Sequence, residues 1–212
     1  MSTRHTTRRI FRDLLAASIR HGELSTESLA EFRLVARFGA SRGAVRETLL
    51  TLTEDGLLRR RQRLGTHLTG NAVRLRWEEP YPGPEPSRFT SEVLADREAP
   101  STPLLRRLLL AEDHQLRMRD ILLALDGTPI GFRTTYLRPA VNGDAPVGTS
   151  PVTVVSAELG TAKADPQAAR FLRVDTGAPM LTRMQVLADP GGGRVAVTFD
   201  QFRGDRVSLV WD

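Results

Sequence analysis

Residues 38–56, with the sequence FGASRGAVRETLLTLTEDG, carry the pattern that decides the fold of the first third of this chain. The preceding segment, Leu29–Phe38, spaces its apolar residues like a helix and ends at a Gly-Ala turn. Ser41 follows the turn, and its side-chain oxygen suits the N-cap of a new helix that runs to about Asp55. The apolar residues of this helix recur at helical spacing and predict one buried face. These residues are Val45, Leu49 and Leu52.

The flanking segments complete an order of elements. Arg8–His21 shows helical periodicity and stops at a glycine, so it predicts a first helix. Two short β-like pieces, Leu57–Arg61 and His67–Thr69, follow the third helix around a turn at Gly65. Helix, helix, short turn, helix and hairpin is the order of a winged helix-turn-helix. The sequence therefore predicts such a domain over residues 1–70.

The third helix also predicts which residues face outward. With the apolar stripe inward, a rotation of about 100° per residue turns Gly43, Ala44 and Arg46 away from the core. Arg42 lies at the boundary in the first turn. Recognition helices insert such N-terminal residues into the major groove, where an arginine can meet guanine with two hydrogen bonds. Ser41 and the first backbone amides suit a phosphate contact. The pattern indicates double-stranded DNA as a partner.

The segment 59–66, RRRQRLGT, is expected to add a basic hairpin beside this helix. Its four arginines, of which we assign Arg61 and Arg63 to DNA, suit contacts with phosphates or a neighbouring groove. A solvated basic hairpin is the alternative interpretation.

Charge is distributed unevenly along the chain. Residues 1–70 hold thirteen arginines and seven acidic residues, a net charge of +6, whereas residues 71–212 carry a net charge of −1. A basic excess confined to the first third favours contact with a polyanion. A basic end that only aids solubility remains the alternative.

The composition excludes several other classes of protein. With no cysteine there are no disulfides, thiol nucleophiles or thiolate zinc sites, and the four histidines lie far apart in sequence. We therefore expect no metal or cofactor. No apolar run approaches the roughly 20 residues that span a bilayer. Charges interrupt the N-terminal apolar residues, unlike those of a signal peptide. The expected location is the cytoplasm, with no membrane partner.

Composition changes sharply after the hairpin. Residues 78–87, EEPYPGPEPS, hold four prolines, and we interpret 71–87 as a semi-extended linker. Beyond Arg88 the chain is rich in β-branched and aliphatic residues, with hairpin turns expected at Asp126-Gly127 and Asp189–Gly193. Adjacent hairpins with few crossover helices predict an antiparallel α+β domain over 88–212. The expected strands are Arg117–Asp126, Pro129–Leu137, Pro179–Ala188, Val195–Arg203 and Val207–Trp211, and the expected helices are Thr102–Leu110 and Asp165–Leu172.

The N-terminal pattern resembles the GntR superfamily of bacterial regulators. The resemblance rests on residues 38–49, Leu52, 55–58 and 65–66. It implies DNA contacts at Ser41, Arg42, Gly43, Ala44, Arg46, Gly65 and Thr66. The chain departs from the family at Ser28-Leu29-Ala30-Glu31, where Leu-Pro-Ser-Glu is usual. Phe32 replaces a frequent arginine, for which Arg33 can substitute, and Arg63 stands where a wing glycine is common.

The remainder resembles the UTRA effector domain of the HutC branch, which has a chorismate-lyase-like fold. The supporting stretches are 125–130, 164–172, 175–181 and 202–206. The resemblance implies a pocket for a small-molecule effector and a homodimer formed through the sheets. Ile121 and Leu123 replace a frequent Arg-x-Arg pair, and Arg133 replaces a frequent glutamate. The identity of the effector therefore does not transfer.

Alternation along the expected strands selects the candidate effector residues. Arg133 and Thr135 share one strand face, and Thr198 and Asp200 share a face of another strand. Arg119 adds a charge. For each of these residues, a surface position or a cross-strand ion pair is the alternative.

These patterns predict a sequence-specific DNA-binding transcription regulator, a metabolite-responsive repressor that binds an inverted-repeat operator as a dimer. One alternative is a DNA-binding or plasmid-maintenance regulator without an effector. Another is a chorismate-lyase-like enzyme. The sequence shows no catalytic triad order, metal cluster or carboxylate pair, so we expect no enzyme activity.

Overall fold

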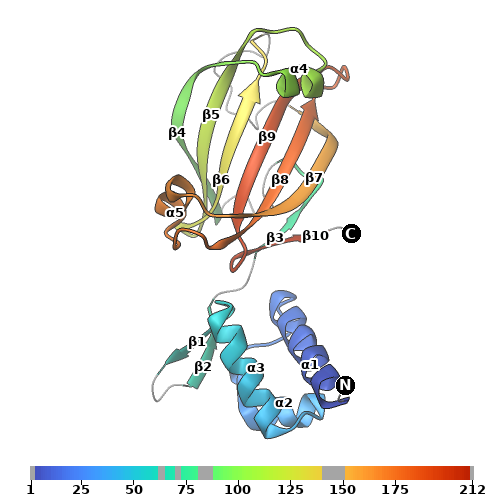
Figure 1. The fold of residues 1–212 in the computed structure, drawn as a ribbon, viewed down its shortest axis with the longest axis vertical. Helices are drawn as coiled ribbons and strands as arrows, with labels where there is room; N and C mark the ends of the chain where they lie inside the picture. Colours follow the sequence, from blue (N-terminus) through green and yellow to red (C-terminus); the bar gives the residue numbers. More distant parts are fainter. Residues whose placement is uncertain (1–2, 62–64, 70–72, 81–87, 140–150, 211–212) are drawn as a thin grey trace. The chain divides into compact units, whose positions relative to one another are not determined.

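The computed structural model describes residues 3–61, 65–69, 73–80, 88–139 and 151–210. The chain forms two compact units (Figure 1), the N-terminal domain Met1–Val73 and the C-terminal domain Arg74–Asp212. Helices dominate the first unit, and antiparallel strands with short helices form the second. The α+β class expected from the sequence is confirmed.

Three α-helices, one 3₁₀ turn and a two-stranded hairpin make up the described part of the N-terminal domain. They are α1 (Thr3–Arg20), a 3₁₀ turn η1 (Thr26–Leu29), α2 (Glu31–Phe38), α3 (Arg42–Glu54), β1 (Leu58–Arg61) and β2 (Gly65–Leu68). This order confirms the predicted winged helix-turn-helix. The second helix begins later than expected, because Leu29 lies in the 3₁₀ turn and Ala30 is extended. Gly39, with a φ of 63°, ends α2 and lets the chain turn into α3.

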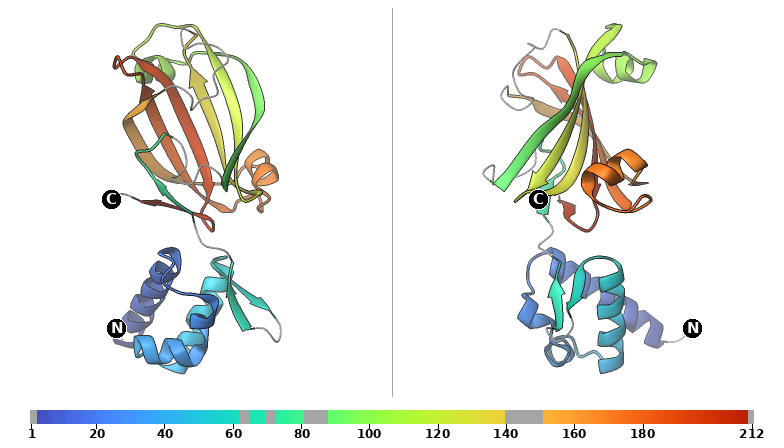
Figure 2. Two further views of the ribbon diagram at one scale, coloured as in Figure 1. Left: turned by 180° about the vertical axis from the view of Figure 1, so that it is seen from behind. Right: turned by 90° about the vertical axis from the view of Figure 1, so that its left-hand side faces the viewer.

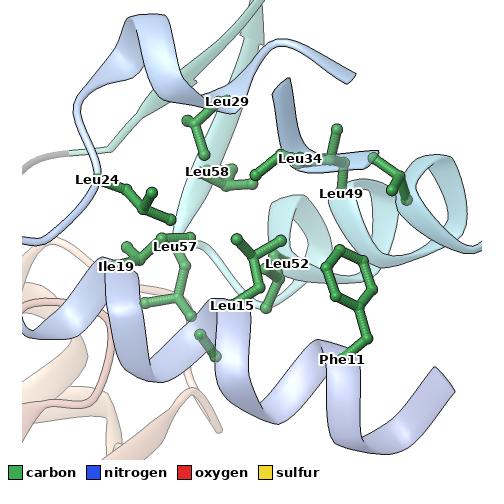
Figure 3. Packing of buried hydrophobic residues seen from close by; sticks show 12 residues of the cluster. Phe11, Leu15, Ile19, Leu24, Leu29, Leu34, Leu49, Leu52, Leu57 and Leu58 are labelled. Carbon is green, nitrogen blue, oxygen red and sulfur yellow. The ribbon is translucent and has the colours of Figure 1, made fainter. Parts of the chain in front are cut away.

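One apolar cluster joins the helices of this domain to the hairpin (Figure 3). Its buried members are Phe11, Leu15, Ala16, Ile19, Leu24, Leu29, Leu34, Val45, Leu49, Leu52, Leu57 and Leu58. The α3 members are the stripe that the sequence predicts. The rings of Phe11 and Phe38 meet edge to face, with centroids 5.4 Å apart. Burial of each leucine contributes about 1.5–3 kcal/mol, so the cluster fixes which face of α3 remains in solvent.

Six antiparallel strands form the sheet of the C-terminal domain, in the order β4-β5-β6-β9-β8-β7. Their bounds are Phe89–Pro100 for β4, Gln115–Leu125 for β5, Thr128–Leu137 for β6, Thr153–Lys163 for β7, Pro179–Ala188 for β8 and Arg194–Arg203 for β9. The two predicted hairpin turns are confirmed. Asp126 and Gly127 both have positive φ between β5 and β6. Between β8 and β9, the Asp189 N–H donates to the Gly193 carbonyl at 2.9 Å.

Two short helices cover one face of this sheet (Figure 2), close to the positions predicted. In α4 (Pro103–Leu109), Leu105 and Leu109 pack with Val186 and Val197 of the sheet. In α5 (Pro166–Leu172), Leu172 packs with Phe132. The side chains of Thr102 and Asp165 cap the two helices by accepting backbone N–H bonds. The two helices thus cover apolar residues of one face. The other face, called the polar face below, carries Arg133, Thr135, Arg183, Gln185, Thr198 and Asp200.

The segment expected as a linker is in part a strand. Val73–Arg76 form β3, which pairs with β10 (Val207–Val210) in a small second sheet. The Trp77 N–H continues the pairing by donating to the Val210 carbonyl at 3.1 Å. Residues 74–80 therefore belong to the C-terminal domain, because β10, distant in sequence, supplies their backbone partners. Within the part of 71–87 that the structure describes, this differs from the linker prediction.

The strands β5, β6, β8, β9 and β10 match the predicted segments, except that Trp211 lies outside the described residues. The sequence did not indicate β4 and β7, which form the two edges of the large sheet. Most side chains of both strands are exposed, so neither shows the strong apolar alternation of a half-buried strand. In the described part of the chain, no helix is long and apolar enough to cross a membrane.

Candidate functional site

The N-terminal end of α3 is organised by its cap. Ser41 is extended, and its hydroxyl accepts a hydrogen bond from the Ala44 N–H at 3.2 Å. This N-cap confirms the helix start predicted from the sequence. The N-terminal end of a helix carries a partial positive charge and favours a phosphate group.

The first turns of α3 present a mixed surface to solvent. Arg42, Gly43 and Arg46 are exposed, as the apolar stripe predicts. Ala44 does not follow that prediction, since only 9% of it is exposed. Thr48, one turn later, is also buried, so the inner face of α3 is wider than the Val45–Leu52 stripe. The Ala44 side chain therefore packs within the N-terminal domain and does not face solvent beside Gly43 and Arg46.

Arg46 is the arginine of α3 with a defined partner. Its Nε donates to the Glu31 carboxylate at 2.8 Å, which links the first turn of α2 to α3. The Arg46 side chain is nevertheless 68% exposed. Exposed ion pairs of this kind contribute about 0.2–1 kcal/mol. Glu31 is therefore a weakly bound partner of Arg46, and a phosphate group can replace it at small cost.

The start of α2 adds two exposed side chains beside this pair. The Arg33 guanidinium lies 5.7 Å from the centroid of the Phe32 ring. Both residues are exposed, and Phe32 is 67% exposed. Arg33 is therefore available to a polyanion from the same end of α2 as Glu31.

The hairpin brings further arginines to the surface of this domain. Arg60 lies opposite Thr66, and Arg61 lies opposite Gly65, whose φ of 86° suits the tight turn. Arg59 and Arg60 are exposed. The sequence-based assignment to DNA names only Arg61 and Arg63, although the same RRR run includes Arg59 and Arg60. Arg63 and the side chain of Arg61 lie outside the described part of the structure.

The polar face of the C-terminal sheet brings the candidate effector residues together. The register places Arg119 opposite Thr135, which in turn lies opposite Thr198. Arg133 lies opposite Asp200 in the neighbouring row. All five residues are at most 7% exposed. Their common face was predicted only within each strand, and the pairing of β6 with β9 joins the two halves.

A buried cluster of ion pairs lies at the centre of this face. The Nε of Arg133 donates to the Asp200 carboxylate at 2.5 Å, and its Nη2 donates at 3.0 Å. Arg183 Nε donates to the same carboxylate at 2.9 Å. The three side chains are at most 1% exposed. The cross-strand ion pair considered as an alternative for Arg133 is therefore present, and it is buried.

Sequence reasoning missed two members of this face. Arg183 lies opposite Asp200, and Gln185 lies opposite Thr198. Both are fully or almost fully buried, and the Arg183 guanidinium stacks 5.4 Å from the centroid of the Phe202 ring. Alternation along the predicted strand Pro179–Ala188 places both residues on one side, so the signal was available.

Burial and pairing shift the pKa values of this cluster in opposing ways. Burial raises the pKa of Asp200, but attraction to Arg133 and Arg183 outweighs it and keeps the pKa below its usual value. Burial lowers the pKa of Arg183, and the Asp200 carboxylate only partly offsets this effect. Two cations that share one buried carboxylate leave the guanidinium charge incompletely compensated.

The remaining candidate, Arg119, belongs to a second pair system at the same face. Its Nε donates to Asp96 at 2.7 Å, and Asp96 also accepts two bonds from Arg117. The hydrogen bond from Arg117 is the main cause that lowers the pKa of Asp96. Arg119 is therefore engaged with β4 and serves to position that strand.

Comparison with known proteins agrees with the geometry of the N-terminal domain. Residues 6–68 match the family model described as bacterial regulatory proteins, gntR family. These residues include most of α1 and all of α2, α3 and the hairpin, with the capped and exposed start of α3. The N-terminal domain is a GntR-family helix-turn-helix domain. A comparison with curated proteins gave no match.

Solved structures extend the likeness beyond the GntR-family domain. YydK from Bacillus subtilis, described as a possible transcriptional regulator, aligns with a TM-score of 0.56 at 14% identity over 97% of this chain and 98% of its own. PhnF from Mycobacterium smegmatis aligns with a TM-score of 0.56 at 20% identity, covering 85% of this chain and 88% of its own. The ligand-binding domain of a protein described as a GntR-family regulator, from Bordetella bronchiseptica, aligns with a TM-score of 0.54 at 18% identity, covering 66% of this chain and 98% of its own. At these identities the likeness concerns the fold, which therefore matches that of GntR-family regulators in both domains.

Proposed function

We propose that this chain is a sequence-specific DNA-binding transcription regulator that reads the major groove with α3. The observation that carries the proposal is the exposed, capped start of α3 within a GntR-family domain. Arg42 and Arg46 are the candidate base-reading residues, since arginine can bind guanine or a phosphate through two hydrogen bonds. Gly43 permits close approach of the backbone to DNA.

Other residues of the same domain are proposed to position it on the phosphate backbone. Ser41 offers the helix start, and Arg33 adds a charge from α2. Wing contacts are proposed for Arg59, Arg60, Arg61, Arg63, Gly65 and Thr66. The basic excess of this domain supports a sequence-independent electrostatic component of affinity.

The C-terminal domain is proposed to bind a small-molecule effector on its polar sheet face and to form a homodimer. The buried cluster around Arg133, Asp200 and Arg183 supports an effector site, with Thr135 and Thr198 beside it. A dimer places two recognition helices about one helical turn apart, so the operator is expected to be an inverted repeat. An effector alters DNA affinity through its different affinities for the two domain arrangements. Repression in the cytoplasm is the expected mode of action, and we assign no catalytic role.

Selection of genomic DNA fragments by the purified chain, at fixed near-physiological salt, tests the proposal. We expect enrichment of one inverted repeat. The Arg42→Ala/Arg46→Ala double variant is the control and is expected to enrich no sequence. Equal weak binding of all fragments by the parent, fading as salt rises, would contradict sequence-specific regulation.

A regulator without an effector is the second candidate function, and one observation favours it. Backbone carbonyls of the chain's own residues 76–80 already contact the polar face. If that contact is permanent, the C-terminal domain serves assembly alone. Whether a small molecule displaces these residues distinguishes the two functions.

A further inference from the structure

The connector, defined as residues Arg76–Pro80, lies on the polar face of the sheet and is held by its backbone. Arg183 Nη1 donates to the carbonyls of Arg76 at 3.0 Å and Glu79 at 3.1 Å. Gln185 Nε2 donates to the Trp77 carbonyl at 2.7 Å, and Arg133 Nη1 donates to the Pro80 carbonyl at 2.8 Å. These donors come from two strands that are more than 50 residues away in sequence. The connector therefore occupies the position of a ligand on this face.

Several polar atoms of the face stay without a partner while the connector is bound. Among the described residues, these buried atoms include Arg183 Nη2, Gln185 Oε1 and the hydroxyls of Thr135 and Thr198. All four side chains are at most 1% exposed. A permanent structural contact would be expected to satisfy such groups, since buried polar atoms nearly always have partners. Carbonyl groups of the connector thus use only part of the hydrogen-bonding capacity of the face.

The charges of the face and of the connector are complementary. Arg133, Arg183 and Asp200 sum to one positive charge in a buried position. In the connector, Arg76 pairs with Glu78 at 3.1 Å and approaches Glu79 at 3.6 Å, leaving one negative charge. Attraction to Glu79 favours the charged form of Arg183. Once the connector leaves, the face keeps one uncompensated positive charge. The N–H groups of Arg183 and Gln185 that bound its carbonyls then become available to another acceptor.

We infer that the connector is an internal occupant of an anion-binding site, and that a small hydroxycarboxylate competes with it for Arg183 and its neighbours. The inference rests on the proposed effector function of this domain. It names the chemical class of the effector and the step that binding triggers, which is release of residues 76–80. These residues run from the last residue of β3 toward β4, so their release frees the chain that joins these two strands of the C-terminal domain.

The arrangement of the face specifies this class of ligand. Arg133, Asp200 and Arg183 form one row across three strands, and Thr135, Thr198 and Gln185 form the adjacent row. The ends of Arg183 and Gln185 nevertheless converge, since both side chains donate to the Glu79 carbonyl at 3.1 Å. A carboxylate accepts from Arg183 in the first row. Gln185 Oε1 in the second row requires a donor, which a hydroxyl group of the same small molecule supplies.

Trp77 provides a reporter inside the connector. The chain has one further tryptophan, Trp211, so Trp211→Phe leaves Trp77 as the sole emitter. The experiment measures acrylamide quenching of Trp77 in this full-length variant during titration with sodium lactate and sodium glycolate. Sodium chloride at equal ionic strength and the neutral analogue lactamide are the controls. We expect a saturable rise in quenching with the two hydroxycarboxylates only.

Two substitutions in the same background locate the effect. Glu79→Gln removes the negative charge of the connector and is expected to lower the lactate midpoint several-fold, because the internal competitor is weakened. Arg183→Gln is expected to raise quenching without any probe and to abolish the lactate response. Glu158→Gln is the matched control, since Glu158 is exposed on β7 and shares the opposite face with Met184. It should behave like the parent.

Two results overturn the inference. One is an equal response to lactamide, and the other is no response to either anion in both the parent and Glu79→Gln. Selection of genomic DNA by the same preparation tests the proposed function separately. Enrichment of an operator without a Trp77 response rejects the anion site and retains the regulator. A Trp77 response to lactate without operator enrichment retains the anion site and rejects the regulator.

Discussion

At the scale of single residues, a few arginines have distinct roles because their surroundings differ. The Arg46 side chain is 68% exposed and forms an ion pair with Glu31. The Arg183 side chain is 0% exposed and forms an ion pair with Asp200. An exposed pair is weak and can be exchanged for another anion, whereas a buried pair is costly to break. The exposed pair of Arg46 suits DNA binding, because a phosphate can take the place of Glu31. The buried pair of Arg183 suits a site that also stabilises the C-terminal domain.

Arg46→Ala is expected to weaken binding to the selected operator by about 1–3 kcal/mol, because the variant loses a two-hydrogen-bond contact to a base. Fluorescence anisotropy with labelled operator measures the change. Arg170→Ala, which removes the same charge from the exposed surface of α5, is the control and should bind like the parent. Equal weakening on operator and unrelated DNA would reassign Arg46 to a phosphate.

Asp200→Asn is expected to destabilise the C-terminal domain by about 3–5 kcal/mol, since it leaves two buried guanidinium groups without their carboxylate. Urea unfolding followed by Trp77 emission, in the Trp211→Phe background, measures this loss. Asp189→Asn, in the β8–β9 turn, is a control for the same chemical change outside the cluster. A change below about 1 kcal/mol in Asp200→Asn would mean that the cluster is not buried in solution.

The same carboxylate predicts a pH dependence. The pKa of Asp200 is lower in the folded protein than the unfolded value of about 3.9. A lowered folded pKa gives stability that is fully present above the unfolded pKa and is lost as pH falls through the folded pKa. The free energy of unfolding of the parent should therefore decrease as the pH is lowered below about 4. The fall should be shallower in Asp200→Asn, and identical slopes would contradict the assignment.

At the scale of elements, α3 combines a stabilising buried face with a residue that weakens the helix. Gly43 lies in the first turn, and a Cβ built there meets no atom within 4 Å. Glycine in a helix costs about 1 kcal/mol relative to alanine. Local packing therefore gives no reason for glycine at this position, and close approach to DNA remains the explanation we propose.

Gly43→Ala is accordingly expected to raise the stability of the N-terminal domain by about 0.5–1 kcal/mol and to weaken operator binding. Thermal unfolding followed by circular dichroism and operator anisotropy measure the two effects in one preparation. Gly191→Ala, in the exposed β8–β9 turn, is the control for DNA binding. Improved stability with unchanged operator affinity would remove Gly43 from the interface.

The strands show which elements a sequence pattern can predict. Segments close to β5, β6, β8 and β9 were predicted because their apolar alternation reflects the face that α4 and α5 cover. The edge strands β4 and β7 are largely exposed and carry little of this signal. Their strand geometry depends on hydrogen bonds from β5 and β8, which no local pattern contains.

At the scale of the whole molecule, the proposed dimer makes a geometric prediction about the operator. Two recognition helices on one face of DNA require half-sites separated by about one turn, near 10.5 base pairs. Insertion of about five base pairs between the half-sites turns one of them to the opposite side of the helix. Affinity should then fall toward that for a single half-site, and insertion of a full turn should restore part of it. Equal affinity for all three operators would contradict a rigid dimer.

The sequence by itself determined the N-terminal domain and its reading helix. The cap at Ser41, the stripe through Leu49 and the turn at Gly39 act within a few residues of each other, so helix periodicity records them directly. It also determined that Arg133 and Thr135 share a face, as do Thr198 and Asp200. Ala44 was misplaced because the width of the buried face of α3 depends on its tertiary neighbours.

Only the tertiary structure decided what the polar face is. Arg133 and Asp200 are 67 residues apart, and Arg183 reaches the connector across 107 residues. Pairing of β6 with β9 and of β9 with β8 joins these charges, and their burial sets their pKa values. A segment that reads as a proline-rich linker becomes the occupant of that face because donors from distant strands satisfy its carbonyls. Such partners are set by register and by what covers the sheet, and neither is encoded in local spacing.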